Sequence, residues 1–446
     1  MANEWPTTKI GDVCLRVTKG TTPTTGGGAF TDRGIAFIKV EAITESGGFL
    51  PEKFAFIDTE TDEKLARSRL QEKDILFTIA GTIGRVAQVT NDILPANTNQ
   101  AVAIVRPNPD LIFPRFLYYV LRDSKRIQLA QSRVVQSVQA NFSLGELSAV
   151  ELPLPPQEEQ RAIAHILGTL DDRIELNRRT NETLEAMARA LFKAWFVDFE
   201  PVRAKMEGRW ERGQSLPGLP AHLYDLFPER LAESELGEIP EGWEMQPLSK
   251  LLTIIGGGTP KTSIEDYWGG EIPWFSVVDT PPASNVFVVA TEKNITAQGL
   301  AGSSARLIPK GTTIISARGT VGNLAIAGCD MTFNQSCYGL RGTGGGGDYF
   351  VYLTSQQMVD QLKSMAHGSV FSTITRQTFE AIQRPVPPPG VLTAFEGLVR
   401  GWFDAILSSV VESRTLAQLR DTLLPKLISG ELRVQDAERV FEEASA

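Results

Sequence analysis

The sequence contains an internal repeat, and this repeat limits the possible folds more than any other feature. Residues 70–87 and 307–325 share the pattern Gly-Thr-x-Gly. Other landmarks recur in the same order: Trp5 and Trp243, Gly20–Pro23 and Gly257–Pro260, Asn99–Gln100 and Asn334–Gln335, Leu152–Pro156 and Arg384–Pro388. Because the offset drifts only from 238 to 232 residues, the chain consists of one unit of about 235 residues repeated in tandem.

Each copy begins with a globular domain that we predict to be α+β. Runs of β-branched and aromatic residues between Gly, Pro and Asn predict strands at Ile35–Val40, Ile75–Ile79 and Ala101–Val105. Helices are expected at Arg115–Gln131 and at its counterpart, Tyr349–Met365. The proline-rich residues 152–156 should end the first domain, because proline fits neither a helix interior nor a central strand.

A long helix is expected after each domain. Residues 157–196 contain no Pro and one Gly, and they are rich in helix-forming Glu, Arg, Ala and Leu. We therefore predict domain 1 at residues 1–155, a first long helix at 156–200, a linker at 201–241, domain 2 at 242–389 and a second long helix at 390–446. We expect some order in the linker around Trp210 and Phe227.

Apolar residues in both helices recur at heptad spacing, which is typical of a coiled-coil seam. The centre of each seam is polar, and buried polar residues at such positions fix register and partner number. We predict that the two helices pair antiparallel as a coiled coil, because tandem copies related by a two-fold axis point in opposite directions. The residues expected to carry the pairing are Leu170, Ile174, Asn177, Asn181 and Leu184 with Trp402, Ile406, Ser409, Ser413 and Leu416. The alternative is that each helix is only the amphipathic flank of its own domain.

The net charge of −9 is unfavourable for a protein that binds a polyanion, but it is unevenly spread. Residues 1–155 hold 17 basic and 17 acidic side chains, and residues 242–389 hold 10 and 10. The acidic excess therefore lies in the helices and the linker, which suit protein partners better than DNA. A neutral domain can still present a basic face.

The cysteines and the hydropathy pattern indicate a cytoplasmic protein. Cys14, Cys329 and Cys337 are odd in number and show no CxxC spacing, so we predict buried, reduced thiols. No apolar run reaches the roughly 18 residues of a membrane span, and residues 1–8 lack a signal-peptide pattern. No membrane partner is expected.

The sequence offers no catalytic or metal-binding constellation. Gly256–Thr262 resembles a P-loop, but Pro260 stands where the glycine before the lysine is needed. Asp279–Ala283 resembles the Asp/Asn-Pro-Pro-aromatic motif of amino-methyltransferases, but it has an extra Thr and lacks the aromatic residue, so we predict a loop. The three histidines, His165, His222 and His367, are too scattered for a metal cluster or a nucleophile-base triad.

Taken together, the doubled order of these motifs resembles the specificity subunit of type I restriction-modification systems. Two segments are similar to the central helical region of that family: LPLPPQEEQRAI at Leu152–Ile163 and LDDRI at Leu170–Ile174. The resemblance implies that each globular unit is a target-recognition domain that reads one half of a split DNA target. It also implies that the helix pair fixes the unread spacer between the halves. In the second copy, Gly390–Leu392 replaces Glu158–Gln160, so the two helix starts differ.

The resemblance further implies which partners and cofactors to expect. The family's subunit binds double-stranded DNA and two methyltransferase subunits, and restriction subunits (an endonuclease and translocase) join them in phage defence. The assembled complex methylates adenine with S-adenosylmethionine or cuts DNA with ATP and magnesium. No cofactor and no catalysis would belong to this chain.

Base reading needs Arg, Lys, Asn, Gln, Ser or Thr on segments that reach the groove edges. In domain 1 the DNA-binding candidates are Lys19, Thr21, Thr22, Lys39, Thr82, Arg85, Asn99, Gln100, Gln139 and Asn141. In domain 2 they are Thr259, Lys261, Thr262, Arg318, Thr320, Asn334, Gln335 and Ser372. The competing interpretation is structural: Gly81, Gly84, Gly319 and Gly322 would shape hairpin turns, and Asn99 and Asn334 would cap turns.

Two other classes of function stay open at this point. A non-enzymatic coiled-coil scaffold would explain the helices, although it leaves the two polar-loop domains unexplained. A DNA-recognition subunit of another methyltransferase-based phage-defence system would have the same architecture. A nuclease with its own active site is disfavoured, because the sequence shows no metal-binding carboxylate set.

Overall fold

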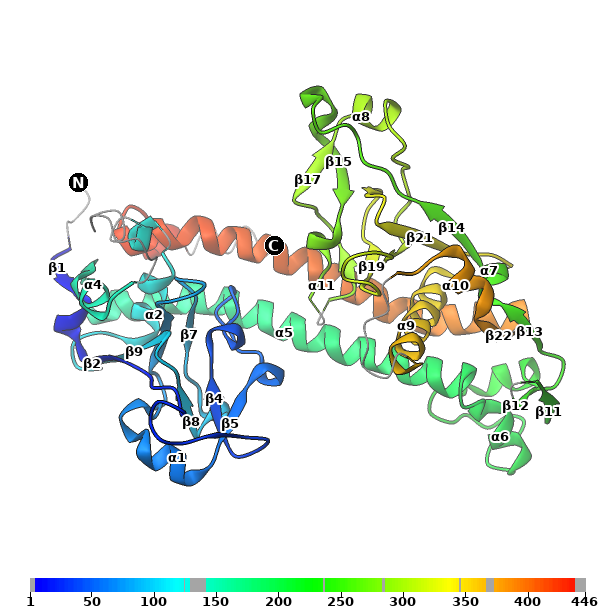
Figure 1. Ribbon diagram of the computed structural model, residues 1–446, viewed down its shortest axis with the longest axis horizontal. Coiled ribbons are helices and arrows are strands. Elements are labelled where there is room, and N and C mark those ends of the chain that lie inside the picture. The colour runs from blue at the N-terminus through cyan, green and yellow to red at the C-terminus, as the bar shows by residue number, and fades with distance from the viewer. Residues whose placement is uncertain are drawn as a thin grey trace. The chain divides into compact units, whose positions relative to one another are not determined.

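The structure, a computed structural model, describes residues 5–123, 125–128, 142–235, 237–282, 285–344, 346–365 and 373–437. The chain divides into unit 1, which comprises Met1–Arg173 and Thr415–Ala446, and unit 2, which comprises Ile174–Arg414. Each unit contains one globular domain and a stretch of both long helices, α5 (Gln157–Phe196) and α11 (Pro389–Ser429) (Figure 1). Neither unit therefore corresponds to one copy of the sequence repeat.

Domain 1, in unit 1, is α+β as predicted. One sheet has the strand order β2-β9-β6-β7 and is antiparallel, and a second has the order β3-β5-β4-β8 with β4 parallel to β8. The strands are β1 (Thr7–Lys9), β2 (Cys14–Lys19), β3 (Phe30–Thr31), β4 (Ile35–Ile38), β5 (Ala55–Ile57), β6 (Ile75–Thr78), β7 (Val86–Gln88), β8 (Ala96–Thr98), β9 (Val102–Pro107) and β10 (Glu151–Pro153). The helices are α1 (Thr59–Lys64), α2 (Pro114–Arg122) and α4 (Leu144–Ala149).

Domain 2, in unit 2, repeats this plan. Its larger sheet has the order β14-β21-β18-β19-β16, its smaller sheet has the order β17-β15-β20, and β15 is parallel to β20. The strands are β13 (Glu244–Pro247), β14 (Leu252–Gly256), β15 (Trp268–Phe275), β16 (Phe287–Val288), β17 (Lys293–Ile295), β18 (Thr313–Ser316), β19 (Leu324–Ala327), β20 (Thr332–Phe333), β21 (Cys337–Gly342) and β22 (Gln383–Val386). The helices are α7 (Leu248–Leu251), α8 (Ala297–Ala301), α9 (Asp348–Met365) and α10 (Arg376–Ala381).

A two-stranded ribbon closes each domain where its chain enters and leaves. In domain 1, β1 pairs with β10 and Thr7 lies opposite Pro153; in domain 2, β13 pairs with β22 and Glu244 lies opposite Val386. The proline-rich segments thus form the second strand of each ribbon. Pro153 is accommodated because a two-stranded ribbon has a free edge that needs no N–H donor.

The long helices differ in how closely they follow the prediction. α5 falls within the predicted range of 156–200, and it begins directly after Pro156. α11 ends at Ser429, well before residue 446, because Gly430 adopts a φ of 75° and breaks the helical backbone. The helix predicted from Arg115 to Gln131 is interrupted, since α2 ends at Arg122 and Asp123 is extended, although residues 125–128 are helical again; residues 129–131 lie outside the described residues.

Within each unit the two long helices share one hydrophobic core and run antiparallel. In unit 1, Ile163 and Leu167 near the start of α5 pack in a cluster with Leu423 and Leu427 near the end of α11. In unit 2 the opposite ends share a second core, in which Leu191 and Trp195 of α5 lie with Phe395, Val399 and Ile406 of α11. The start of one helix therefore meets the end of the other in both units.

The centre of the seam is polar and buried in unit 2. The Asn177 side chain donates to Glu412 Oε2 at 2.8 Å and to Ser413 Oγ at 3.1 Å, and its exposed fraction is only 5%. Asn181 is also buried and donates to Asn285 Oδ1, on a loop of domain 2, at 3.4 Å. The polar centre thus joins the two helices and also contacts domain 2.

A disulfide tests this register. The double variant Asn177→Cys with Ser413→Cys is expected to cross-link within one chain under mild oxidation, because the two side chains are in direct contact. A faster-migrating band on a non-reducing gel, reversed by reductant, would report the bond. The pair Leu176→Cys with Ser413→Cys serves as the control, since Leu176 is 54% exposed. Equal cross-linking of both pairs would contradict the register.

The segment expected to be a linker is largely folded where the structure describes it. It contains α6 (Glu200–Met206) and a hairpin of β11 (Leu231–Ser234) and β12 (Gly237–Pro240). Trp210 and Phe227 are buried, as expected, and the Phe227 ring meets Trp195 edge-on at 5.0 Å. This segment therefore extends the core around the end of α5.

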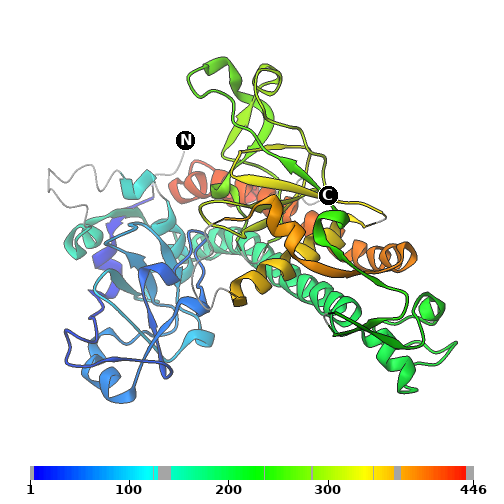
Figure 2. The same cartoon turned by 45° about the vertical axis from the view of Figure 1, so that its right-hand side comes forward.

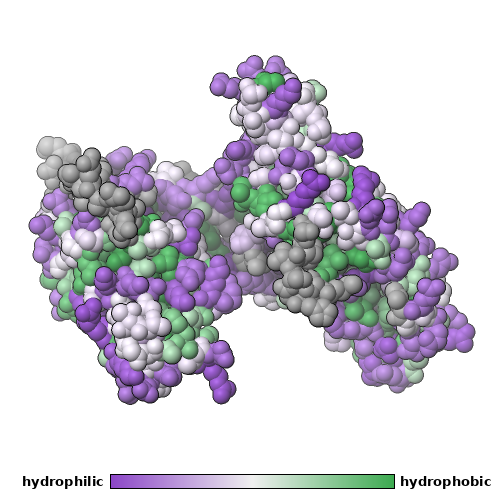
Figure 3. Space-filling view, in the orientation of Figure 1, coloured by the Kyte–Doolittle hydropathy of each residue, from purple (hydrophilic) through white to green (hydrophobic). Residues whose placement is uncertain are grey.

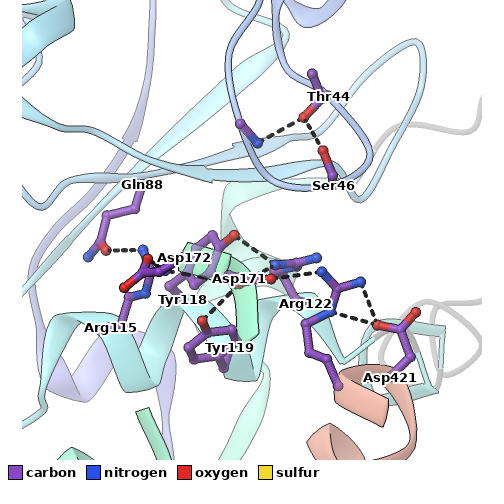
Figure 4. A network of polar contacts seen from close by, with 12 residues as sticks. Thr44, Ser46, Gln88, Arg115, Tyr118, Tyr119, Arg122, Asp171, Asp172 and Asp421 are labelled. Carbon is purple, nitrogen blue, oxygen red and sulfur yellow. Dashed lines mark hydrogen bonds and ion pairs between the residues drawn. The ribbon is translucent and has the colours of Figure 1, made fainter. Parts of the chain in front are cut away.

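Domain 1 is fixed to the helices of unit 1 by the carboxylate of Asp171 (Figure 4). Asp171 accepts hydrogen bonds from Tyr119 Oη at 2.8 Å, Arg122 Nη1 at 3.0 Å and Arg420 Nη1 at 2.7 Å. Burial, reinforced by the charge of Asp171, raises the pKa of the Tyr119 hydroxyl, so Tyr119 stays a donor. Three elements, α2, α5 and α11, meet at this one side chain.

Domain 2 is fixed to the helices of unit 2 through α9, which Figures 1 and 2 show beside α5 and α11. Glu396 of α11 accepts the backbone N–H groups of Tyr349 and Phe350, both at 3.2 Å, at the start of α9. Glu185 of α5 accepts from Tyr352 Oη at 3.2 Å. Burial raises the pKa of both carboxyl groups. The two domains are thus attached by equivalent helices but by different side chains.

The three cysteines are free thiols. Cys337 is buried as predicted, whereas Cys14 and Cys329 are half-buried. Burial raises the pKa of Cys14 and of Cys337 to about 12, which keeps both protonated. Among the residues that the structure describes, no helix is long and apolar enough to cross a membrane.

Candidate DNA interface

In domain 1 the predicted residues gather where the chain crosses from one sheet to the other. β8 of the β3-β5-β4-β8 sheet leads into β9 of the β2-β9-β6-β7 sheet through Asn99–Ala101. Gly20 lies across this connection, because its N–H donates to Val102 O at 3.3 Å and the next N–H, of Thr21, donates to Thr98 O at 3.1 Å. A Cβ on Gly20 would stand 2.0 Å from the carbonyl oxygen of Thr98, so only glycine fits here.

The Gly81–Gly84 turn lies beside the same connection between β8 and β9. The Thr78 hydroxyl donates to Thr82 O at 2.6 Å and accepts from Arg85 N at 2.9 Å, which holds the turn from inside. Gly81 and Gly84 have φ values of 73° and 93°, so their expected role in the turn is confirmed. Ile79 N donates to Ala101 O at 2.8 Å, which ties the turn to the crossing.

Domain 2 builds the same arrangement with partly different residues. Gly257 lies against the crossing from β20 to β21, where a Cβ would stand 2.1 Å from Asn334 O. The Ser316 hydroxyl takes the place of Thr78: it donates to Thr320 O and accepts from Asn323 N at 2.9 Å. Ala317 N donates to Ser336 O at 2.8 Å. Three segments therefore meet in both domains. They are the glycine loop (Gly20–Pro23 or Gly257–Pro260), the Gly-Thr-x-Gly turn (Gly81–Gly84 or Gly319–Gly322) and the Asn-Gln crossing, which is the connection between the two sheets (Asn99–Ala101 or Asn334–Ser336).

A threonine and a glutamine face each other at this place in each domain. The Thr22 hydroxyl donates to Gln100 Oε1, and the Thr259 hydroxyl donates to Gln335 Oε1. Asn99 and Asn334 accept the N–H of the residue two positions on, Ala101 and Ser336, both at 3.1 Å. Their side chains thus cap turns, which was the structural alternative for these two asparagines.

The two arginine candidates are in different situations. Arg85 donates to Ile43 O at 3.0 Å and lies 3.4 Å from Glu45 Oε1, and its side chain is 24% exposed. Arg85 therefore holds the loop that follows Val40. Arg318 is exposed beside the Gly319–Gly322 turn, and no residue in the described part of the chain pairs with it. Of the two, Arg318 is the side chain that is available to a ligand.

The remaining candidates divide by exposure. Lys39 is half-buried with its ammonium 4.5 Å from the centre of the Phe30 ring. Thr21, Thr22 and Thr259 are half-buried at the crossing, whereas Lys19, Thr82, Lys261, Thr262 and Thr320 are exposed. Gln139, Asn141 and Ser372 lie outside the described residues. They precede Phe142 and Thr373, and Phe142 N donates to Ile79 O at 2.9 Å while the Thr373 hydroxyl donates to Ala317 O at 3.1 Å.

One exposed cation near this place in domain 2 was not predicted. Arg306 follows Ala305, whose backbone N would stand 2.4 Å from a Cβ on Gly258. Arg306 is 47 positions along the chain from Thr259, so nothing in a single sequence connects the two residues. Figure 3 shows that the outer end of domain 2, around α8 and β15, is mostly of intermediate hydropathy, with hydrophilic residues at its sides.

The motifs that resembled catalytic loops have structural roles here. Asp279 accepts the N–H groups of Ser276 at 2.8 Å and Glu292 at 2.6 Å, and so organises the loop that was predicted at 279–283. Gly257 packs against Phe333 and Asn334 where β20 leads into β21, and Gly258 packs against Ser304 and Ala305. In the described ranges, no three His, Cys, Asp or Glu side chains form a group suited to a metal ion.

Comparisons with known proteins agree on one family. A family model described as the type I restriction modification DNA specificity domain matches residues 2–186 and 240–390. The specificity subunit of the type I restriction enzyme HindI from Haemophilus influenzae is 30% identical over 432 residues, which cover 87% of this chain and 93% of that protein. The MjaIX specificity subunit from Methanocaldococcus jannaschii is 26% identical over 382 residues, which cover 81% and 78%.

The fold also has a counterpart among solved structures. The S subunit of a type I restriction-modification system from M. genitalium matches with a TM-score of 0.52 and 15% identity. The match covers 96% of this chain and 97% of that one, so the fold is shared over almost the whole length. At this identity the likeness concerns the fold alone.

Proposed function

Because the chain belongs to the family of type I restriction-modification DNA specificity subunits, we propose that each of its two domains reads one half of a bipartite target in double-stranded DNA. Members of this family select the DNA sequence, and the chemistry lies elsewhere. One observation carries the proposal: both domains bring the glycine loop, the Gly-Thr-x-Gly turn and the Asn-Gln crossing to one place, although the intervening sequence differs.

The two half-sites should differ in sequence. Ala80 of domain 1 corresponds to Arg318 of domain 2, and Arg85 corresponds to Asn323. Arginine donates two parallel hydrogen bonds to guanine in the major groove, and alanine cannot. Two domains with the same backbone and different exposed side chains would therefore read an asymmetric target.

The helix pair would hold the two domains at a fixed separation. A regular helix of 40 residues such as α5 measures about 60 Å, and an antiparallel partner stiffens it. We therefore assign the unread spacer between the half-sites to α5 and α11, which would make the spacer independent of the recognition domains.

The repeat also supports our assignment of the partner subunits in the proposed complex. A chain that contains its globular domain and its long helix twice suits two copies of one partner, which we assign as two methyltransferase subunits, with restriction subunits joining them. The complex would methylate adenine with S-adenosylmethionine, or cut DNA with ATP and magnesium, and its partners would hold these groups.

Footprinting tests the proposal directly. The chain assembled with its methyltransferase partner is expected to protect two short DNA segments separated by an unprotected spacer. The sequence of the target comes from mapping modified adenines in the host genome with and without the gene. A single continuous footprint, or one that does not depend on sequence, would contradict the proposal.

Arg318 gives a prediction for one half-site. Arg318→Ala is expected to relax specificity at one base pair of the second half, at a cost of about 1 to 3 kcal/mol, and to leave the first half unchanged. Binding to duplexes with single substitutions in either half measures this. Lys310→Ala, also exposed in domain 2 but before the start of β18 and thus at the opposite end of that strand from the Gly319–Gly322 turn, is the matched control and should leave both affinity and base preference unchanged. Unchanged base preference in Arg318→Ala would remove Arg318 from the reading set.

A further inference from the structure

We propose that the two Thr–Gln pairs, Thr22 with Gln100 and Thr259 with Gln335, bind phosphates of the DNA backbone instead of reading bases. This inference rests on the proposed function, since it assigns a ligand group to the same face of each domain. Each pair joins the glycine loop to the crossing between the two sheets. The pairs are among the few polar side-chain contacts that both domains share.

The first argument concerns which atoms remain available. In each pair the threonine hydroxyl donates to the glutamine oxygen. Within the described residues, neither glutamine's side-chain amide nitrogen nor its backbone N–H donates to a protein acceptor. The same holds, in that part of the chain, for the backbone N–H groups of Thr22 and Thr259. Each pair therefore presents a cluster of N–H donors at the surface.

The second argument concerns which DNA group such a cluster fits. Glutamine reads adenine by donating to N7 and accepting from N6, so it needs its oxygen. In both domains that oxygen already accepts from threonine. A phosphate has only acceptor atoms, and neutral amides and backbone N–H groups are common phosphate ligands. A cluster made mainly of N–H donors, whose glutamine oxygen already accepts one hydrogen bond, fits phosphate better than a base edge.

The third argument comes from the repeat. Around the pairs the two domains differ: Thr21 corresponds to Gly258, Thr98 to Phe333 and Ala101 to Ser336. A contact that determines one half-site has no reason to be identical in a domain that reads the other half. The phosphate backbone is what both halves have in common, so an identical pair should contact it.

The charges near the pairs agree with an anionic ligand. Lys19 is exposed two positions before Thr21, and Lys261 is exposed two positions after Thr259. Arg306 is exposed beyond Ala305, which faces Gly258. Positive charge at this place raises the local concentration of DNA.

The test uses the chain assembled with its methyltransferase partner and three DNA duplexes. One duplex carries the target, one has its first half scrambled and one has its second half scrambled. Gln335→Ala is expected to weaken binding to all three by the same factor, roughly tenfold, because it removes hydrogen bonds to a charged acceptor. Gln100→Ala should act in the same way. Gln71→Ala, an exposed glutamine before the start of β6 and thus at the opposite end of that strand from the turn, is the control and should bind like the wild type.

Gln335→Glu distinguishes a contact with a DNA phosphate from a purely structural contact between two loops of the protein. Glutamate keeps an oxygen for the Thr259 hydroxyl but has no N–H donors, and its charge repels phosphate, so the loss should exceed that of Gln335→Ala. Wild-type affinity in Gln335→Glu would show that the pair only fastens two loops, and would overturn the inference. A loss limited to duplexes with an intact second half would show base reading and would also overturn it. If the wild type bound all three duplexes equally, the proposed function would fail, while a uniform loss in Gln335→Glu would still support the phosphate contact.

Discussion

Replacing Asp171 by alanine is expected to destabilise unit 1 by about 3 to 5 kcal/mol, because the change leaves two buried guanidinium groups without their shared carboxylate. The side chains of Asp171, Arg122 and Arg420 are 13%, 10% and 9% exposed, so water replaces little of the lost interaction. Tyr119 also loses the acceptor of its hydroxyl. Breaking a buried pair costs far more than breaking a surface pair, for which about 0 to 1 kcal/mol is typical.

Chemical denaturation monitored by hydrogen exchange measures this effect, because exchange reports on unit 1 separately from unit 2. Asp172→Ala is the matched control: Asp172 is the next residue of α5, lies 3.8 Å from Arg115 and is 82% exposed. Asp172→Ala should change the stability of unit 1 by less than about 1 kcal/mol. Equal effects of the two variants, or faster exchange in unit 2 alone, would contradict the role assigned to Asp171.

The Asp171 contacts also show which part of the fold a sequence cannot supply. The heptad spacing predicted the seam, but the same spacing that joins Ile406 to Ser413 continues to Arg420, and an arginine without a partner would be destabilising in a seam. Arg420 is 7% exposed there because it meets Asp171, 249 positions away in the sequence. A single sequence contains the spacing of one helix, but not the partner that a side chain finds on another.

The features that could be predicted are those set by local chemistry and by the repeat. The bounds of α5 follow from the proline before it and from its composition, and the two strand-rich domains follow from their β-branched runs. The glycines of the turns could be placed because only glycine tolerates their φ values. These properties depend on neighbouring residues, so the sequence is enough.

The candidate interface was predicted less completely, for the same physical reason. The repeat identified Thr22, Gln100, Thr259 and Gln335, but nothing in the text indicated that they pair. Arg85 was a candidate for base reading, yet its guanidinium binds Ile43 O, and that contact depends on a loop some forty positions earlier. Contacts between distant segments determine which exposed side chains remain available to DNA.

Replacing residues 244–386 by a second copy of residues 6–154 is expected to change the methylated target into one whose second half is the reverse complement of its first. The two segments have equivalent ends: Leu154 N donates to Pro6 O at 2.8 Å, and Glu244 pairs with Val386. The exchange therefore begins and ends in a two-stranded ribbon and leaves α5 and α11 intact. The spacer between the halves should keep its length.

The helix that receives the new domain must also match it. A shift of 232 residues places Leu392, Glu396 and Phe403 at the levels of Gln160, Ala164 and Asp171. Gln160 accepts from Phe113 N at 2.7 Å at the start of α2, and Asp171 binds Tyr119 and Arg122. The hybrid therefore carries Leu392→Gln, Glu396→Ala and Phe403→Asp. The ring contacts of Phe403 are with Phe287, Tyr349 and Tyr352, all of which the exchange removes.

Mapping methylated adenines in a host that lacks the wild-type gene, with the methyltransferase partner present, reads out the result. The control is a chain that carries the three substitutions but keeps its own domain 2. Its complex should no longer methylate DNA, because the backbone N–H groups of Tyr349 and Phe350 at the start of α9 lose Glu396 as their acceptor. An unchanged second half would mean that the domain does not carry the reading function. A change in the first half would mean that the domains do not read independently. We predicted from the sequence that the tandem copies are related by a two-fold axis, and a DNA duplex shares that symmetry, so two identical domains are expected to read an inverted repeat.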